Sequence, residues 1–153
     1  MARYTRKGKS KIAFVPTVAV LSAPTLAEIN AGTSLDPHMA EMSGFQFSNS
    51  VIKTPDLSTT FVSQIPGEDE ADDSSITFYD DDTSEVVRDA LVKGAAGFIV
   101  LMPYGKTATK RCEVWPATST GFNDEWTVAN EAAKAVAQFS ITAPPNQTAT
   151  ITA

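Results

Sequence analysis

The clearest periodic pattern in the chain lies near its C-terminal end, in residues 133–142. Apolar side chains occupy every second position of this run, from Ala133 to Ile141. Because successive side chains of a strand point to opposite faces, this alternation is typical of a strand with one buried face. The pattern therefore predicts a half-buried antiparallel strand, which a turn at 144–146 connects to a final strand over 148–152.

Shorter apolar runs predict the remaining strands. Residues 97–103 form a continuous apolar run, GFIVLMP, which is typical of a strand covered on both faces. We expect a turn at 104–106 to connect it to a strand over 110–116, which ends before a loop at 118–125. Further strands are expected closer to the N-terminus, over residues 11–15, 17–21, 44–53, 57–65 and 75–79.

Helix signals occur in two segments. In residues 84–93, Asp82 and Glu85 have the spacing of a capping box, and Gly94 stands where a C-terminal stop belongs. The apolar stripe of this helix consists of Val87, Ala90 and Leu91. Residues 24–32 begin with proline and end with glycine, which predicts one or two further helical turns. Together these elements predict a mainly β fold, a β-sandwich or open barrel with one packed α-helix.

Length and composition place these elements in a single domain, residues 1–153. A chain of this size buries roughly two thirds of its unfolded surface on folding. Its apolar content, 42%, is ordinary for a globular protein. The single cysteine, Cys112, excludes an intrachain disulfide framework, and we expect it to be a buried structural thiol.

Charge is distributed unevenly along the chain, whose net charge is −6. Residues 1–11 form a basic N-terminal arm. Its basic residues are Arg3, Arg6, Lys7, Lys9 and Lys11. The rest of the chain has a large excess of carboxylates, which repel phosphate. Binding to duplex DNA through its backbone is therefore disfavoured, except through the arm.

An acidic loop is expected over residues 66–74. It contains Glu68, Asp69, Glu70, Asp72 and Asp73. Mutual repulsion and the lack of apolar residues predict that this loop is mobile in an isolated subunit. Three hypotheses remain open for it: a solvated loop that keeps strand edges apart, an assembly or lumen-lining function, and a site for a divalent metal. The metal hypothesis has the least support, because DEADD lacks the D-x-[DN]-x-[DN]-G pattern of a calcium loop.

The sequence contains no constellation for catalysis or for a cofactor. His38, the only histidine, lies in a proline loop without a second histidine for a metal or a paired nucleophile. Trp115 and Trp126 are expected to be core or interface anchors rather than platforms for base stacking. We therefore expect neither an enzyme nor a cofactor-binding protein.

The N-terminal segment leaves a second hypothesis open. The basic arm and the apolar residues that follow it resemble a secretory signal, with Ser22 and Ala23 as a small-residue cleavage site. Pro16 interrupts the apolar run, which favours strands instead. With a cleaved signal, the chain would be a secreted or surface β-sandwich binding module. No run approaches the ~18 apolar residues of a membrane span.

The order of elements resembles the tail tube (major tail) proteins of long-tailed bacteriophages. A strand, a helix and a strand lead to KRCEVWPAT, an alternating strand ends in AQFSIT, and a proline turn enters a closing strand. The resemblance extends from about Ala13 to the C-terminus. It implies a structural virion protein that forms hexameric rings, which stack into a hollow tube for the passage of DNA. It implies a location in the virion tail and, during assembly, in the host cytoplasm.

The resemblance also implies the partners. These are further copies of the chain, tape measure and tail terminator proteins, and DNA as passing cargo, without a membrane, a cofactor or catalytic residues. Some carboxylates of residues 66–74 are expected to line or rim the lumen, and this loop is expected to become ordered against neighbouring subunits. From the separation of opposite charges we further expect the basic arm to contact the acidic loop of a neighbour in the next ring.

Overall fold

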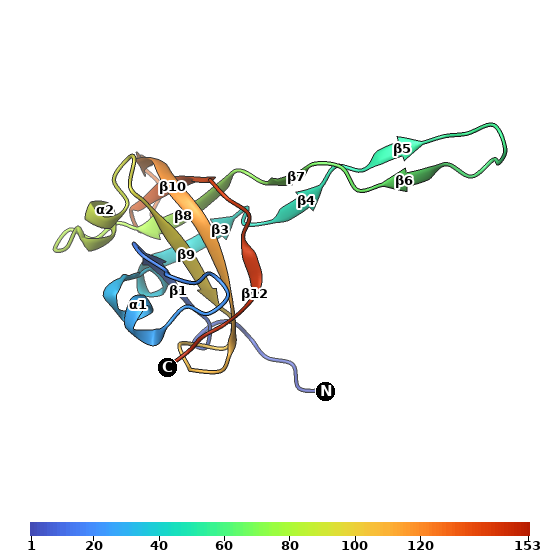
Figure 1. The fold of residues 1–153 in the computed structure, drawn as a ribbon. Coiled ribbons are helices and arrows are strands. Elements are labelled where there is room, and N and C mark those ends of the chain that lie inside the picture. Colours follow the sequence, from blue (N-terminus) through green and yellow to red (C-terminus); the bar gives the residue numbers. More distant parts are fainter.

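The computed structural model describes residues 1–153. The fold is mainly β, as the sequence predicts, and its main sheet runs in the antiparallel order β2–β1–β9–β10–β11–β8–β3 (Figure 1). The strands of this sheet are β1 (Lys11–Val15), β2 (Thr33–Ser34), β3 (Met39–Ser43), β8 (Ser74–Tyr79), β9 (Ala96–Met102), β10 (Arg111–Glu125), β11 (Lys134–Ile141) and β12 (Asn146–Thr150), which pairs with β10. A short 3-10 helix, η1 (Asp36–His38), lies between β2 and β3.

Strand β10 organises the sheet because it has different partners along its length. Its first part pairs with β9 on one side and with β12 on the other, while Ala117 to Glu125 pair with β11. A β-bulge between Ser119 and Gly121 increases the local twist of the strand. The predicted loop at 118–125 is therefore wrong, because the backbone of these residues continues the strand into the ladder with β11.

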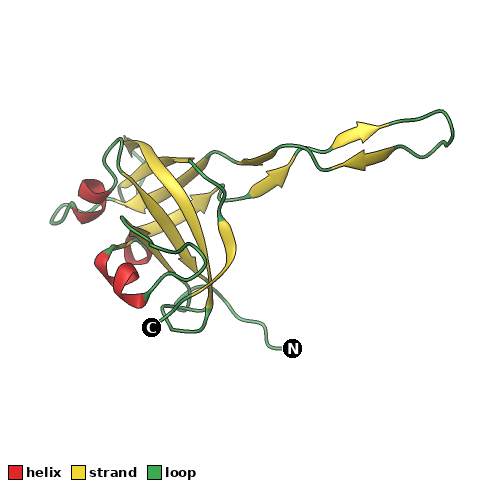
Figure 2. Cartoon of the chain, viewed as in Figure 1, coloured by secondary structure: helices red, strands yellow, loops and turns green.

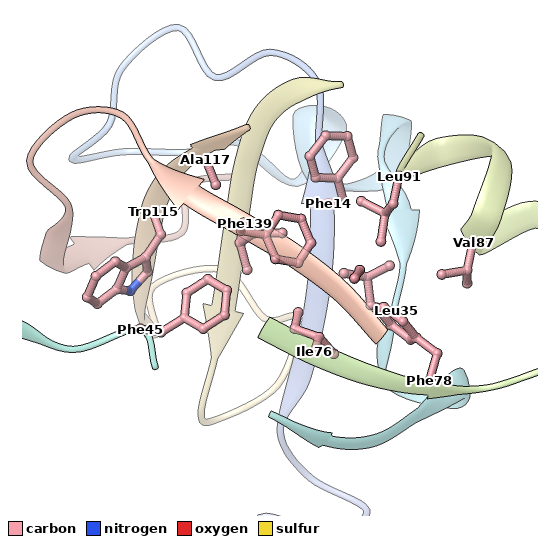
Figure 3. Close-up of a cluster of buried hydrophobic side chains, with 12 residues drawn as sticks. Phe14, Leu35, Phe45, Ile76, Phe78, Val87, Leu91, Trp115, Ala117 and Phe139 are labelled. Carbon is pink, nitrogen blue, oxygen red and sulfur yellow. The ribbon is translucent and has the colours of Figure 1, made fainter. Parts of the chain in front are cut away.

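The larger core cluster lies on the inner face of the curled sheet (Figure 3). Side chains from β1, β8, β9, β10 and β11 meet in this cluster, so the sheet closes around it as an open barrel. Helix α2 (Val86–Ala90) covers the cluster with Val87, and the buried Leu91 follows directly, as the predicted stripe requires. The cluster consists of Phe14, Leu35, Phe45, Ile76, Phe78, Val87, Leu91, Ile99, Trp115, Ala117, Ala137 and Phe139.

A second cluster lies on the other face of β1, β9 and the first part of β10, beneath helix α1 (Leu26–Ala31). Ile99 belongs to the first cluster and its neighbour Val100 to the second, and both are fully buried. The prediction of a strand covered on both faces is thus confirmed. Cys112 is also fully buried here, as predicted, and burial raises the pKa of its thiol to about 11.

Both helices are shorter than predicted. Helix α1 begins after a capping box, in which the Thr25 hydroxyl accepts from the Glu28 N–H and the Glu28 carboxylate accepts from the Thr25 N–H, each at 3.1 Å. The capping box predicted for α2 is absent, since Glu85 is its N-cap and makes no side-chain hydrogen bond. The carboxylate of Asp81 instead accepts from the N–H and hydroxyl of Thr83, which forms a separate turn before the helix. These two hydrogen bonds lower the pKa of Asp81.

The structure of β1 and of the segment after it bears on the hypothesis of a cleaved signal. Residues 17–21 do not form the predicted strand, because the Ala19 N–H donates to Glu28 at 2.7 Å and Val18 packs in the second cluster. Strand β1 lies between β2 and β9, and all its residues pair with β9. Cleavage after Ala23 would remove this strand from the sheet and uncover the core, so the structure argues against a signal. Neither α-helix is long enough to cross a membrane.

Candidate assembly interface

Residues 46–73 form a long hairpin that projects from the barrel (Figures 1 and 2); we call it the hairpin arm. Strands β4 (Phe47–Asn49) and β7 (Asp69–Ala71) pair next to the barrel, and β5 (Ile52–Thr54) and β6 (Ser63–Ile65) pair further out. The sequence predicts strands over 44–53 and 57–65, and these residues do contain strands. The structure differs in placing them outside the main sheet, as a two-stranded extension.

The waist between the two ladders depends on an asparagine and a glycine. The Asn49 side chain donates to the Gly67 carbonyl and accepts from the Gly67 N–H, each at 3.0 Å. It thus provides the hydrogen bonds that a backbone partner would make in a ladder, next to Pro66, which has no N–H to donate. A Cβ atom at Gly67 would lie 1.9 Å from the carbonyl oxygen of Ser50. Only glycine therefore allows the two backbones to approach this closely.

The root of the hairpin arm is tied to the core. Gly44 and Phe45 both have a positive φ, +83° and +57°, which turns the chain out of β3. The Ser74 hydroxyl accepts from the Phe45 N–H at 2.9 Å and donates to the Asp72 carbonyl at 3.0 Å, which joins both strands of the arm. The Phe45 side chain is buried in the larger core cluster. These contacts set the direction in which the arm leaves the barrel.

The outer part of the arm carries apolar side chains that nothing covers. Phe61, for example, has 74% of its surface exposed. The exposed set consists of Val51, Ile52, Leu57, Phe61, Val62 and Ile65. Isolated two-stranded hairpins are marginally stable in water, and contiguous exposed apolar surface marks an interaction site. We call these six residues the apolar tip.

The predicted acidic residues all lie on the returning side of the hairpin arm and are exposed. Asp69 and Glu70 belong to β7 and pair with Asn49 and Ser48 across the ladder. The prediction of an acidic loop over 66–74 is therefore wrong for Asp69–Ala71, which form a strand. The remaining members, Glu68, Asp72 and Asp73, lie directly beside that strand. The pairing of β4 with β7 could not be predicted from the sequence, because the two strands are separated by about twenty residues and neither has an apolar pattern.

The basic N-terminal arm is exposed but has a defined shape. Its turn closes with a hydrogen bond from the Ser10 N–H to the Arg6 carbonyl at 2.9 Å. Tyr4 packs on Tyr104 with ring centroids 5.6 Å apart, and the Lys9 ammonium lies 4.9 Å from the centre of the Tyr4 ring. Arg3, Arg6 and Lys7 are exposed. Lys11 differs from the rest of the arm, because it begins β1 and forms an ion pair with Asp36 at 3.4 Å.

A third charged group lies beside helix α2. Arg88 forms ion pairs with Asp80 and Asp124, and its guanidinium stacks over Phe122 at 4.7 Å. The hydrogen bond with Asp124 raises the pKa of Arg88. These contacts attach the helix to the far end of β10. No set of three or more histidine, cysteine, aspartate or glutamate side chains is arranged to hold a metal ion.

The two tryptophans have different environments. Trp115 is fully buried in the larger core cluster, which confirms the prediction of a core anchor. Trp126 follows β10 and is 91% exposed, so it does not contribute to the core of a single chain.

Comparison with known proteins identifies a matching family and solved structures with a similar fold. A family model described as phage tail tube protein matches residues 1–153. No curated protein sequence matches the chain significantly.

Solved structures with a similar fold come from contractile injection systems. The sheath/tube terminator of the extracellular contractile injection system PVC, in its extended state, has a TM-score of 0.67 at 10% identity and covers 95% of this chain and 99% of that chain. A chain of the 6-fold symmetrised baseplate of the anti-feeding prophage has a TM-score of 0.63 at 8% identity, over 95% and 97%. The tube-terminating cap of the anti-feeding prophage has a TM-score of 0.61 at 10% identity, over 96% and 94%. At these identities the likeness shows a common fold.

Proposed function

Because the chain belongs to the phage tail tube protein family, we propose that it forms hexameric rings that stack into the hollow tail tube through which the phage genome passes. The chain is a structural tail component and not an enzyme. Its place is accordingly the tail of a virion or of a related particle, and we propose that it assembles there from the host cytoplasm. The 6-fold symmetry of the baseplate that contains one structural neighbour supports the hexameric ring.

The main structural support for this proposal is the projecting hairpin arm with its exposed apolar tip. The six residues of its apolar tip belong to neither core cluster, so they do not contribute to the burial that stabilises the barrel. Its apolar surface becomes buried if the arm lies against a neighbouring subunit. An arm that leaves one subunit and binds the next makes a heterologous contact, which closes into rings or repeats along an axis.

The acidic surface supports a role in DNA passage. In an assembled tube, carboxylates of the hairpin arm that face the lumen would repel the phosphate backbone, so that DNA moves through without binding. Glu68, Asp69, Glu70, Asp72 and Asp73 are the residues we propose for the lumen or its rim. The tape measure protein and the tail terminator are the further partners we propose.

Electron microscopy of concentrated protein tests the proposal directly. We expect rings of six subunits, or tubes of stacked rings, with an open central channel. Particles without a channel, or a protein that stays monomeric at every concentration and salt condition, would contradict it.

A variant of the apolar tip tests the contribution of the hairpin arm. Leu57→Ser/Phe61→Ser should abolish rings and tubes and leave the thermal unfolding of the monomer unchanged, since neither side chain belongs to a core cluster. Val92→Ser/Val128→Ser is the matched control, because both valines are exposed and lie outside the arm. Assembly of the tip variant at the wild-type level would show that another surface joins the subunits.

A tube terminator is the second candidate function. The terminator and cap proteins have higher TM-scores with this chain than the sheath-tube complex of PVC, which reaches 0.51. A terminator forms one ring that ends a tube, whereas a tube subunit repeats along the axis. Micrographs that contain single rings and no tubes would favour the terminator.

A further inference from the structure

The basic N-terminal arm and the acidic residues of the hairpin arm lie in two separate regions of the fold. The N-terminal arm lies beside the turn between β9 and β10, at the lower end of the barrel in Figure 1, because Lys11 pairs with Met102. The hairpin arm leaves the upper part of the barrel. The ion pairs within the chain do not join these regions. Their opposite charges are therefore uncompensated in a single subunit.

The lower region is a basic platform with interleaved aromatic rings. Lys9 lies over Tyr4, Tyr4 packs on Tyr104, and Arg111 lies 5.6 Å from the centre of the Tyr104 ring on the body of the barrel. We define the basic platform as Tyr4, Arg6, Lys7, Lys9, Tyr104 and Arg111. None of its cations forms an ion pair within the chain. Since the rings and the turn already hold the arm in shape, less conformational entropy is lost when this surface binds a partner.

The upper region contains a groove at the base of the hairpin arm. It is an open groove of about 370 Å³ between the β4–β7 ladder and the turn that follows β11. Apolar side chains form much of its wall, and two carboxylates of β7 belong to its lining. We define the acidic groove by Phe47, Asp69, Glu70, Ile141, Pro144 and Pro145. Glu70 has no cationic partner, and Asp69 has only the amide of Asn49.

We infer that the acidic groove of one subunit binds the basic platform of a second copy, and that this contact sets the axial register between stacked rings. The inference rests on the proposed function, because it supplies the head-to-tail contact that a repeating tube needs. The occupant is a second copy because its exposed cations match the groove in charge, and because no ion pair within one chain joins the groove to the platform.

Charge pairs at such an exposed surface contribute little individually and are screened over ~8 Å at physiological salt. Their effect falls on the rate and the register of association, because like charges in a wrong register repel. The apolar tip and the strand edges supply the burial that holds the rings together. The two surfaces thus have separate functions, which charge-reversal variants can distinguish.

The test exchanges the charges of the two surfaces. One variant carries Arg6→Glu/Lys7→Glu and the other carries Asp69→Lys/Glu70→Lys. By light scattering, each variant alone should polymerise about tenfold more slowly than wild type or worse, since loss of electrostatic steering costs at least that factor. An equimolar mixture should recover the wild-type rate, because each reversed surface then meets a complementary one. Lys93→Glu/Lys134→Glu and Asp89→Lys/Glu131→Lys are controls with the same changes in net charge outside the two surfaces. The rate of polymerisation of these two control variants should not rise when they are mixed in equal amounts.

The outcomes separate this inference from the proposed function. If wild-type protein forms tubes and both reversal variants polymerise at its rate with its salt response, the inference is overturned and the tube function stands. If both variants are slow and the mixture stays slow, the two surfaces do not face each other, which also overturns it. If wild-type protein never assembles, the proposed function fails and the inference fails with it. Recovery confined to the mixture supports the inference, because loss of folding in either variant could not produce it.

Discussion

Phe45 packs edge-to-face on Trp115, with ring centroids 5.8 Å apart and ring planes at 85° (Figure 3). Phe45 belongs to the root of the hairpin arm and Trp115 to β10, so this contact joins the projecting arm to the core of the barrel. The indole N–H of Trp115 is buried without a hydrogen-bond partner. The pair therefore links the stability of the barrel to the orientation of the element that we propose for assembly.

Replacing Phe45 should weaken both the barrel and the arm. Phe45→Ala should lower the free energy of unfolding by ~3–5 kcal/mol, because it removes a buried aromatic ring. Phe45→Gly should cost no more than Phe45→Ala, although glycine usually costs more, because the φ of +57° favours glycine. Chemical denaturation of both variants measures this, with Phe61→Ala at the exposed tip as the control. A glycine variant clearly less stable than the alanine variant would show that the backbone at position 45 is not strained.

Gly67→Ala should impair assembly without affecting the barrel. The added methyl group would meet the Ser50 carbonyl oxygen at 1.9 Å, so the waist of the hairpin arm must open and the apolar tip must move. The free energy of unfolding of the monomer should change by no more than a neutral surface substitution changes it, about 0.5 kcal/mol. Gly121→Ala is the control, since its nearest atom would be a side-chain nitrogen at 3.6 Å. Micrographs with normal tubes for Gly67→Ala would mean that the geometry of the waist does not matter.

Adjacent residues after helix α2 should respond very differently to truncation. Leu91 is fully buried in the larger core cluster, whereas Val92 is about half exposed. Leu91→Ala should cost ~2–5 kcal/mol of unfolding free energy, and Val92→Ala less than ~0.5 kcal/mol. Urea titration of the two variants gives the comparison. Similar losses would show that the segment packs with a different face.

The buried thiol should make the stability fall in alkaline solution. Burial raises the pKa of Cys112 from 9.0 to about 11 in the folded chain, so the unfolded chain loses this proton first as the pH rises. The stability linked to this thiol is complete below about pH 9 and is lost between about pH 9 and pH 11. Cys112→Ala should remove this part of the decline in denaturation curves recorded across that window. Identical pH profiles for the two proteins would contradict the assignment, since all other ionisable groups are the same in both.

Resistance to thiol reagents is an independent check of the same burial. The single cysteine should react with a maleimide only after denaturation. Rapid labelling of native protein at neutral pH would show that the second core cluster opens.

The sequence predicts the strands in which the positions of apolar residues match the buried faces. The alternation over 133–142 corresponds to β11, in which Ala135, Ala137 and Phe139 are buried. The apolar run at 97–103 corresponds to β9, and 11–15 coincides with β1. The resemblance to tail tube proteins, built on the order of these elements, is confirmed by the family match over the whole chain.

The elements that no burial pattern marks could not be placed from the sequence. Residues 118–125 contain Thr, Ser, Gly, Asn and Asp, which signal a loop, but the ladder with β11 holds them in a strand. The acidic segment at 66–74 has the composition of a loop as well, but Asp69–Ala71 pairs with Phe47–Asn49. In both cases hydrogen bonds to a partner strand outweigh local propensity.

By itself the sequence determined a mainly β fold, its buried strands, its family and the separation of basic from acidic residues along the chain. Local periodicity contains this information, because burial of one face or both faces selects the residue types of a strand. The tertiary structure alone decided that residues 46–73 project from the sheet as a hairpin arm with an apolar tip, and that the basic and acidic arms lie in separate regions of the fold. Pairing and register depend on groups far apart in the chain, such as Ser74 with Phe45 and Lys11 with Met102, which no local pattern records.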